Sequence, residues 1–476
     1  MLVDPTSPSK QSQPYRLRRV SWANLAKYLR YCRTYGVLNA TRLAFRKIRR
    51  GGQLPTFLEP LSVDLYSESG ADSPIDLIRK KISIIIPTRD AGPDFGLLLR
   101  KLKSQKGIEQ IQIVLVDSGS TDDTVKLATS ENADVISIAP DSFSHSYARN
   151  CGAARTTGDY LLFFVQDALP LTDVWLWEMA RALESNDVVG VSCAEYPRAD
   201  CDLFYRFVIW NHYRSLQLDH DRILQWDPSC TSMAGLRTNA QISGISFLVR
   251  RDVFQQYWYS GDYAEDLQLG IRLIQDGYKV GFLYSTRVLH SHARPASYFL
   301  KRGYVDARYL AKILPEYNFP TLRDTIHVFG SICSLYQRLV SMTTLLDQCS
   351  PVATAEFMAD LHQQIVAPAI PEREMVLDEG FDNFVHSLCG RSTAEYDAAS
   401  NMILPHLLQH LTTLQEFLCR TYPQVDESLS SEIRNCVVKM FALHAGTHLA
   451  YLYLAQGDVQ SDPCLLEIDR NLVKGV

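Results

Sequence analysis

The sequence predicts an α/β domain with a mostly parallel central sheet, followed by an α-helical C-terminal domain. Three observations predict this fold class. Short apolar runs rich in β-branched residues alternate with helical stretches from Lys81 onward, as in βαβ units. From about Pro315 the strand signals give way to long segments with helical periodicity. The chain has 476 residues, too many for one ordinary core, since single domains usually have about 100–200.

The expected strands are nearly continuous apolar runs, a pattern typical of parallel strands that are covered on both faces. They are Ile82–Ile86, Ile111–Val116, Val135–Ile138 and Tyr160–Val165, with helices expected around Phe95–Gln105 and Thr124–Ser130. A later strand-like segment comprises Val280–Tyr284 and Val288-Leu289. The C-terminal helices are expected within Thr325–Leu346, Ala353–Ile365 and Asn401–Arg420.

Changes in composition and hydrophobic pattern along the chain predict five parts. They are a disordered tail over 1–14, a basic amphipathic helical segment over 15–50, a linker over 51–78, the α/β domain over 79–314 and an α-helical domain over 315–476. The linker is inferred from glycines and prolines that break any hydrophobic period. The role of the helical domain is left open by its sequence.

The segment 15–50 is strongly basic, although the chain as a whole has a formal net charge of -5. Between Tyr15 and Arg50 there are eleven Lys and Arg residues and no Asp or Glu. Such a segment can make peripheral contact with an anionic membrane surface. The alternative is a solvated helix that packs against the catalytic domain.

The composition is that of a globular protein, with 46% hydrophobic and 21% charged residues, which excludes a wholly disordered or fibrous chain. The eleven cysteines are scattered singly without zinc-like spacing, and we expect them to be reduced thiols. No apolar run reaches the roughly 18 residues that span a bilayer. We therefore expect a cytoplasmic protein, peripheral at the inner face of the plasma membrane if residues 15–50 bind lipid.

Polar residues follow several of the apolar runs, and in an open parallel sheet ligands bind beyond the carboxyl ends of the strands. The first run is followed by Pro87-Thr88-Arg89-Asp90, the second by Asp117-Ser118-Gly119-Ser120 and the fourth by Gln166-Asp167. A carboxylate such as Asp167 is well placed there to hold a divalent cation, which usually also contacts substrate phosphates. Taken alone, an Asp after a strand is more often a turn residue, and Ser120–Asp123 is best interpreted as a helix cap.

Five segments in a fixed order resemble the inverting glycosyltransferases of family 2, which have the GT-A fold, a Rossmann-like architecture. The segments are Ile82-Ser-Ile-Ile-Ile-Pro-Thr88, Val114-Leu-Val-Asp-Ser-Gly-Ser-Thr-Asp122, Tyr147-Ala-Arg-Asn-Cys-Gly-Ala153, Gly158-Asp-Tyr-Leu-Leu-Phe-Phe-Val-Gln-Asp167 and Glu265-Asp-Leu-Gln-Leu-Gly-Ile-Arg272. The resemblance covers roughly residues 81–310, and the ordered set is far more specific than any one member. It implies transfer of a sugar from a nucleotide diphosphate to a glycan or lipid-linked acceptor, with no role for nucleic acid.

The resemblance also implies roles for individual residues. The nucleotide-contacting positions are Pro87, Thr88, Arg89, Asp117, Arg149 and Gln166. In the acidic pair Glu265-Asp266, Asp266 matches the catalytic base, which takes a proton from the acceptor hydroxyl as it attacks the anomeric carbon. The alternative to a catalytic role is that the pair simply begins a helix, because the helix dipole favours acidic residues at the N-terminus.

The metal motif departs from the family pattern. Asp167 matches the last carboxylate of the Asp-x-Asp motif, but Val165 stands where the first carboxylate is expected. His290 or His292, at the end of the later strand-like segment, could complete a site for Mg²⁺ or Mn²⁺. Gln166-Asp167-Ala168, together with Phe143-Ser-His-Ser upstream, resembles the rhamnosyltransferase-type branch and suggests a dTDP-sugar donor.

Two other function classes stay open at this point. The missing first Asp and the large helical region are compatible with a noncatalytic nucleotide-sugar-binding or scaffold protein. A nucleotidyltransferase would also combine a nucleotide-binding α/β half with a metal. It should carry a Gly-rich loop with a basic residue directly after the first strand, and Pro87–Gly92 does not supply one.

Overall fold

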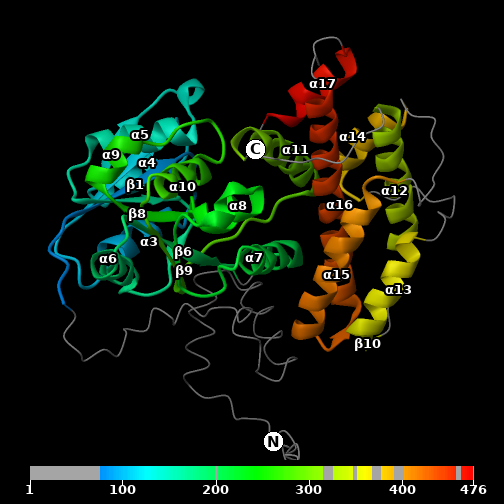
Figure 1. Cartoon of the computed structure of the whole chain (residues 1–476), viewed down its shortest axis with the longest axis horizontal. Helices are drawn as coiled ribbons and strands as arrows, with labels where there is room; N and C mark the ends of the chain where they lie inside the picture. Colours follow the sequence, from blue (N-terminus) through cyan, green and yellow to red (C-terminus); the bar gives the residue numbers. More distant parts are fainter. Residues whose placement is uncertain are drawn as a thin grey trace, which may run out of the picture. The chain divides into compact units, whose positions relative to one another are not determined.

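A nine-stranded mixed sheet forms the core of the first half of the chain (Figure 1). The computed structural model describes residues 76–198, 201–314, 325–346, 351–366, 377–390, 401–456 and 462–474. The predicted tail 1–14, the basic segment 15–50 and all of the linker up to residue 75 lie outside these residues. All the described residues belong to one compact unit, Leu54–Val476.

The first four strands form the parallel part of the sheet. They are β1 (Ile82–Thr88), β2 (Ile111–Asp117), β3 (Asp134–Ser137) and β4 (Tyr160–Phe164), close to the apolar runs from which they were predicted. Their spatial order is β3-β2-β1-β4, and all three pairings are parallel. The register places Thr88 beside Asp117, so the polar residues that close β1 and β2 lie next to each other.

The second half of the sheet continues from β4 in the order β8-β6-β9-β5, and β7 pairs with β9. These strands are β5 (Leu169–Pro170), β6 (Gly190–Tyr196), β7 (Arg222–Leu224), β8 (Ser246–Arg250) and β9 (Val280–Leu289). β8 runs antiparallel to both β4 and β6, whereas β6 and β9 are parallel. Because β8 joins the two halves, the end of β4 faces the loop that leads into β8.

Helices cover both faces of the sheet. The helices of this half are α3 (Phe95–Lys103), α4 (Thr124–Ser130), α5 (His145–Arg155), α6 (Trp175–Ser185), α7 (Leu203–Ser215), α8 (Met233–Ala240), α9 (Arg251–Tyr257), α10 (Glu265–Gln275) and α11 (Ala296–Ile313), with 3₁₀ turns at Pro140–Ser142 and Pro228–Thr231. Apolar side chains of α3 and α6 pack on one face, and those of α5, α9 and α10 on the other. This is the layered arrangement that buries both sides of a largely apolar sheet.

The C-terminal region is helical. It comprises α12 (Thr325–Leu346), α13 (Thr354–Val366), α14 (Glu379–Cys389), α15 (Leu404–Thr421), α16 (Glu427–Ala455) and α17 (Pro463–Leu472), with one small ribbon of β10 (Val352–Ala353) and β11 (Gln424–Val425). α11 and α16 approach so closely that a Cβ atom at Gly303 would lie 2.0 Å from the Leu443 carbonyl oxygen. The predicted fold class, an α/β domain with an α-helical C-terminal region, is confirmed.

Helix α7 joins the sheet half to the helical region through charged contacts. Arg206 donates to the Tyr422 hydroxyl at 2.8 Å and forms an ion pair with Glu432. At the start of the same helix, Asp202 pairs with Lys439 of α16 at 2.6 Å. Arg206 is only 8% exposed, so its pairing satisfies a charge that burial would otherwise make costly.

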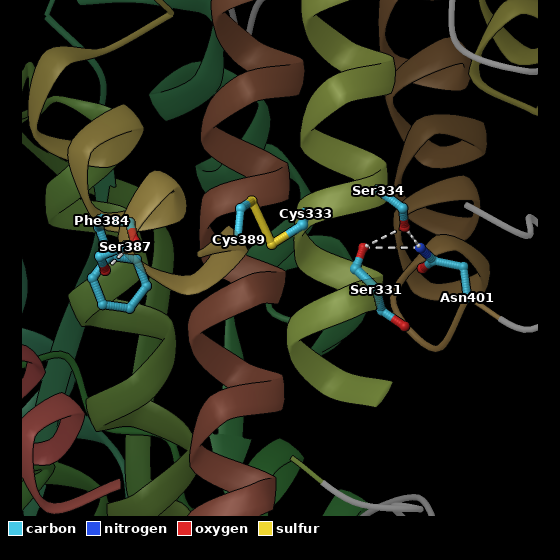
Figure 2. The surroundings of a disulfide bond; sticks show 7 residues. All are labelled: Ser331, Cys333, Ser334, Phe384, Ser387, Cys389 and Asn401. Carbon is cyan, nitrogen blue, oxygen red and sulfur yellow. Dashed lines mark hydrogen bonds between the residues drawn. A yellow bond between two sulfur atoms is a disulfide. The ribbon is translucent and has the colours of Figure 1, made fainter. Parts of the chain in front are cut away.

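Two cysteines are disulfide-bonded and not reduced, as had been predicted for all of them. Cys333 of α12 and Cys389 of α14 form a disulfide, with 5.6 Å between their Cα atoms (Figure 2). The expectation that all cysteines are reduced thiols is therefore wrong for this pair, because the two helices pack side by side and bring together residues 56 positions apart. The other cysteines of the described ranges are not disulfide-bonded. Of the helices in these ranges, none has both the length and the apolar character that crossing a bilayer requires.

Candidate active site

Asp117 connects the end of β1 with the turn that follows β2. Its carboxylate accepts hydrogen bonds from the backbone N–H groups of Gly119 and Ser120, at 3.1 and 3.0 Å, and from the Thr88 hydroxyl at 3.3 Å. Gly119 has a φ of 92°, a conformation that glycine adopts without strain. Thr88 and Asp117 are thus brought together as expected at the carboxyl edge of the sheet, where they shape the turn.

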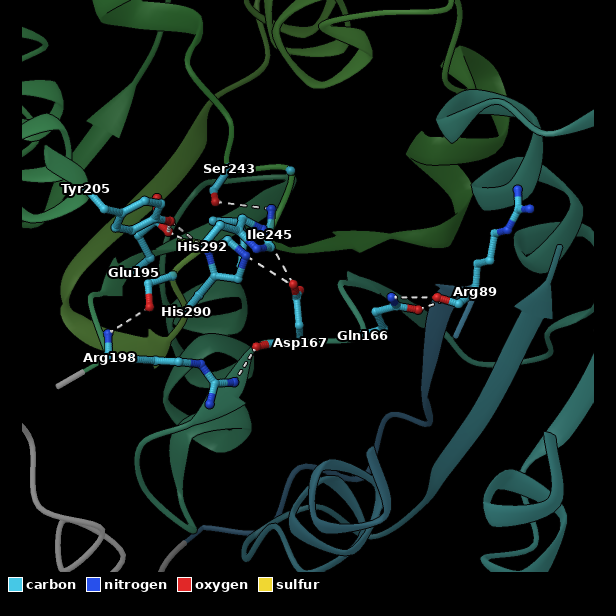
Figure 3. A network of polar contacts seen from close by, with 12 residues as sticks. Arg89, Gln166, Asp167, Glu195, Arg198, Tyr205, Ser243, Ile245, His290 and His292 are labelled. Atoms are coloured by element: carbon cyan, nitrogen blue, oxygen red, sulfur yellow. Dashed lines mark hydrogen bonds and ion pairs between the residues drawn. The ribbon is translucent and has the colours of Figure 1, made fainter. Parts of the chain in front are cut away.

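Gln166 fixes the end of β4 to the loop after β1. Its side-chain oxygen accepts from the Arg89 N–H at 2.8 Å, and its side-chain nitrogen donates to the Arg89 carbonyl at 3.0 Å (Figure 3). The amide of Gln166 is therefore occupied by the backbone, whereas the Arg89 side chain is exposed. Pro87 is half-buried directly before this edge. The predicted nucleotide contacts of Pro87, Arg89 and Gln166 stay predictions.

Asp167, His290 and His292 come together although more than 120 residues separate the aspartate from the histidines in sequence. One carboxylate oxygen and two imidazole nitrogens lie within 4.8 Å of one another. His290 Nε2 is 3.5 Å from Asp167 Oδ1, and His292 Nε2 is 3.5 Å from Asp167 Oδ2. Across the described ranges this is the one group of three such side chains whose ligand atoms converge. Two imidazoles and one carboxylate form a donor set suited to a divalent transition-metal ion.

A second layer of polar contacts orients His290. Its Nδ1 lies 2.7 Å from Glu195 Oε2, and the Tyr205 hydroxyl donates to the same carboxylate oxygen at 2.6 Å. With Nδ1 held by Glu195, Nε2 is the nitrogen that faces Asp167, as Figure 3 shows. A metal-ligating histidine usually has such a carboxylate partner, which sets its tautomer and ring orientation.

The charges of Asp167 and Glu195 change the pKa of His290, and His290 changes that of Asp167. Burial disfavours a charged imidazole at His290, but Asp167 and Glu195 outweigh it and raise its pKa to about 9. Burial also works against ionisation of Asp167, yet the contact with His290 leaves the pKa of this carboxyl below its usual range. In the chain without a bound ion, His290 is thus protonated at neutral pH, and a cation that binds its Nε2 has to displace this proton.

Glu195, Tyr205 and Arg198 are site residues that the sequence did not indicate. Arg198 donates to the Asp167 carbonyl at 2.7 Å and fixes the turn that presents the carboxylate. Glu195 stands within the buried strand β6, which gave no signal of its own. Its full burial in an otherwise apolar strand is the feature that could have identified it, because a buried carboxylate needs a partner.

The acidic pair Glu265-Asp266 begins α10, as predicted, after Ala264 in a left-handed conformation with φ 51°. Glu265 is buried and forms an ion pair with Arg149, whose Nη2 also donates to the Gly244 carbonyl at 3.0 Å. Arg149 is itself only 4% exposed. Both residues therefore anchor the start of α10, and their predicted catalytic and nucleotide-binding roles stay predictions.

Asp266, unlike the buried Glu265, is half-buried. Its Oδ1 accepts the N–H of Leu267 at 2.7 Å. Burial, together with the adjacent negative charge of Glu265, raises the pKa of Asp266 to about 6. A carboxylate with such a pKa is ionised near neutral pH and is a better proton acceptor than an ordinary aspartate.

One loop borders both halves of the site. The Ile245 carbonyl accepts from Val165, next to the Gln166-Asp167 turn, at 3.2 Å. In the same loop, a Cβ atom at Gly244 would lie 2.8 Å from Asp266 Oδ2. The segment Ser243–Ile245 therefore lies beside both the turn that carries Asp167 and the predicted base, and Gly244 allows the close approach of the Asp266 carboxylate.

Comparison with known proteins identifies the family. The model of the family "Glycosyl transferase family 2" matches residues 83–257, which include β1, β2 and β4 with the polar residues at their ends. The chain carries a family 2 glycosyltransferase domain. The expected resemblance is thereby confirmed, and the scaffold and nucleotidyltransferase alternatives are set aside.

Relatives of the family 2 domain include two Salmonella proteins. The O-antigen chain rhamnosyltransferase RfbN of Salmonella typhimurium is 28% identical over 217 residues, which are 44% of this chain and 67% of that protein. The O-antigen chain rhamnosyltransferase WbaN of Salmonella anatum is 26% identical over 218 residues, which are 44% of this chain and 66% of that protein. The alignments thus span about two thirds of each relative.

Solved structures resemble the chain only loosely. The mannosyltransferase PcManGT of Pyrobaculum calidifontis, in complex with GDP-Man and Mn²⁺, has a TM-score of 0.38 and 14% identity, with 87% of this chain and 99% of that chain covered. Glucosyl-3-phosphoglycerate synthase of Mycobacterium tuberculosis has a TM-score of 0.37 and 16% identity, covering 56% of this chain and 86% of that chain. The GT-A assignment of the family 2 domain follows from the family match and from the sheet described above.

Proposed function

We propose that this glycosyltransferase is a metal-dependent inverting enzyme that moves rhamnose from a dTDP donor to a glycan or lipid-linked acceptor. The observation that carries the proposal is the position of the loop 243–245. It contacts Val165, next to the turn that carries Asp167, through Ile245, and it lies against the Asp266 carboxylate at Gly244. Inversion needs such an arrangement, because the base and the leaving diphosphate act on opposite faces of the anomeric carbon.

Asp167, His290 and His292 would hold the cation. Their mixed donor set favours Mn²⁺ over Mg²⁺, which takes oxygen ligands almost exclusively. Bound there, the ion would supply positive charge to the diphosphate as the glycosidic bond breaks. The missing first carboxylate of the usual motif is replaced in this proposal by the two imidazoles.

Asp266 would act on the acceptor. Its carboxylate removes the proton of the attacking hydroxyl, and the new bond forms at the anomeric carbon from the face opposite the nucleotide. Arg149 and Glu265 hold the first turn of α10 in place, so that the carboxylate keeps its position beside Gly244. No covalent intermediate is required in this scheme.

The donor is inferred from the relatives. RfbN and WbaN are named rhamnosyltransferases of O-antigen chains, and the segment Gln166-Asp167-Ala168 resembles the rhamnosyltransferase-type branch of the family. We propose the same sugar here, and an acceptor in polysaccharide biosynthesis at the cell envelope. The basic segment 15–50 would bring the enzyme to a lipid-linked acceptor on an anionic membrane.

A screen of nucleotide sugars by thermal shift, followed by transfer assays with and without Mn²⁺, tests this function. A dTDP-sugar should raise the melting temperature more than UDP- or GDP-sugars, because a ligand that binds only the folded state stabilises it. The matched variants are Asp167→Asn and, as a control on the same half of the chain, Asp187→Asn, an exposed residue that pairs with Lys279. Equal turnover in Mn²⁺ and in a chelator would refute metal dependence, and preference for another nucleotide would refute the donor.

A further inference from the structure

A cavity of about 610 Å³ lies between the first turn of α7 and α16, outside the residues assigned to sugar transfer (helices in Figure 1). The first residue of α11 and the start of α14 also border it. Its polar side chains are those of Asp202, Asp378, Glu432, Asn435 and Lys439, and the rest of its lining is apolar or contributed by cysteine. The volume is within the roughly 300–1,000 Å³ of pockets that bind small ligands.

The cavity is acidic, and its charged groups already have partners. Three carboxylates and one ammonium group line it. Lys439 pairs with Asp202 at 2.6 Å, Glu432 forms an ion pair with Arg206, and the Asp378 carboxylate accepts two backbone N–H groups at 3.0 Å. A phosphate would add negative charge to these surroundings, and a cationic peptide would have to compete with Lys439 and Arg206. The charges therefore disfavour a nucleotide, a lipid diphosphate and a basic peptide.

The same groups suit the hydroxyl groups of an uncharged sugar chain. Of the roughly four hydrogen bonds that an ionised carboxylate can accept, Asp202 and Asp378 each receive two from the described residues. Both can therefore accept further bonds from hydroxyl groups, and bonds to a charged acceptor are the stronger ones. The amide of Asn435, an exposed residue of α16, and the ammonium group of Lys439 can donate. Phe204 adds apolar surface for the C–H face of a sugar ring.

The cavity is connected to the proposed metal site through two elements. Asp202 precedes Tyr205 by three residues, and the Tyr205 hydroxyl donates to Glu195 at 2.6 Å. Ala296, which lines the cavity, follows His292 by four residues. Four residues of chain reach at most about 14 Å. A molecule whose one end occupies the sugar-transfer site can therefore reach the cavity with its other end.

Helix α11 leads from the cavity toward the predicted base. Its first residue, Ala296, lines the cavity, and Asp306, ten residues later, accepts a hydrogen bond from the Tyr263 hydroxyl. Tyr263 precedes Asp266 by three residues. Ten residues of α-helix rise about 15 Å. A single sugar ring does not span this length, whereas a chain of several sugars does, so the cavity suits a segment of an oligosaccharide.

We propose that this cavity binds an uncharged segment of the glycan acceptor, several sugar units away from the hydroxyl that receives the new sugar. The inference rests on the proposed function, because it gives the acceptor of that reaction a second point of attachment. Asn435 and Lys439 of α16 and Asp378 at the start of α14 would contact its hydroxyl groups. Long acceptors would then be used more efficiently than short ones, because binding energy from remote parts of a substrate raises kcat/KM.

Calorimetry with a tetrasaccharide of rhamnose tests the cavity without donor, metal or turnover. We expect the full chain to bind the tetrasaccharide and to bind methyl rhamnoside, a single sugar, much more weakly. Asn435→Trp places an indole at the cavity and should weaken tetrasaccharide binding at least about tenfold, because the added bulk excludes the ligand. Ser428→Trp is the matched control, since Ser428 is exposed on the same helix and does not line the cavity. Should Asn435→Trp fail to fold, as judged by circular dichroism, Asn435→Leu removes the amide alone and decides the question.

Transfer kinetics separate this inference from the proposed function. With dTDP-rhamnose and Mn²⁺, Asn435→Trp should raise KM for the tetrasaccharide at least about tenfold and leave KM for the donor unchanged. A wild type that does not bind the tetrasaccharide would overturn the cavity as a glycan site, and so would equal affinity in Asn435→Trp and Ser428→Trp. Tetrasaccharide binding that only the Asn435 variants weaken, without rhamnose transfer in any chain, would support the cavity and refute the proposed transfer.

Discussion

Replacing Asp266 by Asn should separate the chemistry of the site from its stability. The amide has nearly the shape of the carboxylate, and its oxygen can still accept the N–H of Leu267 that Asp266 Oδ1 accepts at 2.7 Å. The change therefore removes the proton acceptor without removing the contact that begins α10. We expect sugar transfer to be lost, whereas nucleotide binding stays nearly unchanged.

The magnitude for stability follows from the pKa. Burial and the charge of Glu265 raise the pKa of Asp266 from 3.8 to about 6. At about 1.4 kcal/mol per pH unit this corresponds to about 3 kcal/mol of unfavourable ionisation in the folded state. Because Asp266 is only half-buried, solvent screens part of this effect, and we expect about 1–3 kcal/mol.

The sign depends on pH. Between about pH 4 and pH 6 the carboxyl is still protonated in the folded chain and already ionised in the unfolded one, so the wild type loses stability as the pH rises through this window. Asn does not titrate. The free energy of unfolding of Asp266→Asn should therefore match that of the wild type near pH 4 and exceed it above pH 6.

The assay combines two measurements on the same samples. Denaturant unfolding at pH 4.5 and pH 8 gives the difference in stability, and release of nucleotide diphosphate in the presence of an acceptor gives turnover. Asp262→Asn, an exposed residue of the same loop, serves as the control and should change neither quantity. Undiminished turnover in Asp266→Asn would remove this residue from the mechanism. A stability difference that does not depend on pH would refute the electrostatic argument.

Three further predictions concern the remaining groups of the site. Asp167→Ala should weaken Mn²⁺-dependent nucleotide binding as well as rate, and an unchanged affinity in a titration would mean that the cation is held elsewhere. Tyr205→Phe removes the hydroxyl that donates to Glu195 at 2.6 Å, so calorimetry should show Mn²⁺ affinity reduced by about 10–100-fold with little loss of stability. Gly244→Ala places a methyl group 2.8 Å from Asp266 Oδ2 and should therefore lower kcat. Gly390→Ala is the control, because only the His386 carbonyl lies near the added methyl group, at 3.8 Å, and kcat should not change. Equal kcat in both variants would contradict the close approach of Gly244 to Asp266.

Much of the sheet could be predicted from the sequence because its parallel strands are buried on both faces. Ile84–Ile86 in β1 and Ile113–Val116 in β2 are apolar without interruption, and the polar residues that end the two strands stand out. The histidines after β9 could be found for the same reason. A parallel sheet gathers strand ends at one edge, so a local pattern was sufficient to propose Asp167 and His290 as neighbours.

The supporting residues could not be predicted in this way. Glu195 is the penultimate residue of β6, a strand that was not predicted, and Tyr205 lies on the helix that begins after this strand. Their link to His290 depends on the position of α7, which long-range packing decides. The antiparallel β8 between β4 and β6 is a similar case, because periodicity does not show which strands pair.

The contacts of α7 connect the proposed metal site to the C-terminal region. Tyr205 contacts Glu195, the partner of His290, and lies close to Asp202 and Arg206 in the sequence of α7. Asp202 and Arg206 both pair with side chains beyond residue 420. Cutting the chain after α11 would leave the buried guanidinium of Arg206 facing water without its partners. We expect a shortened enzyme of this kind to keep its sheet and to hold His290 less firmly, which calorimetry should show as weaker Mn²⁺ binding.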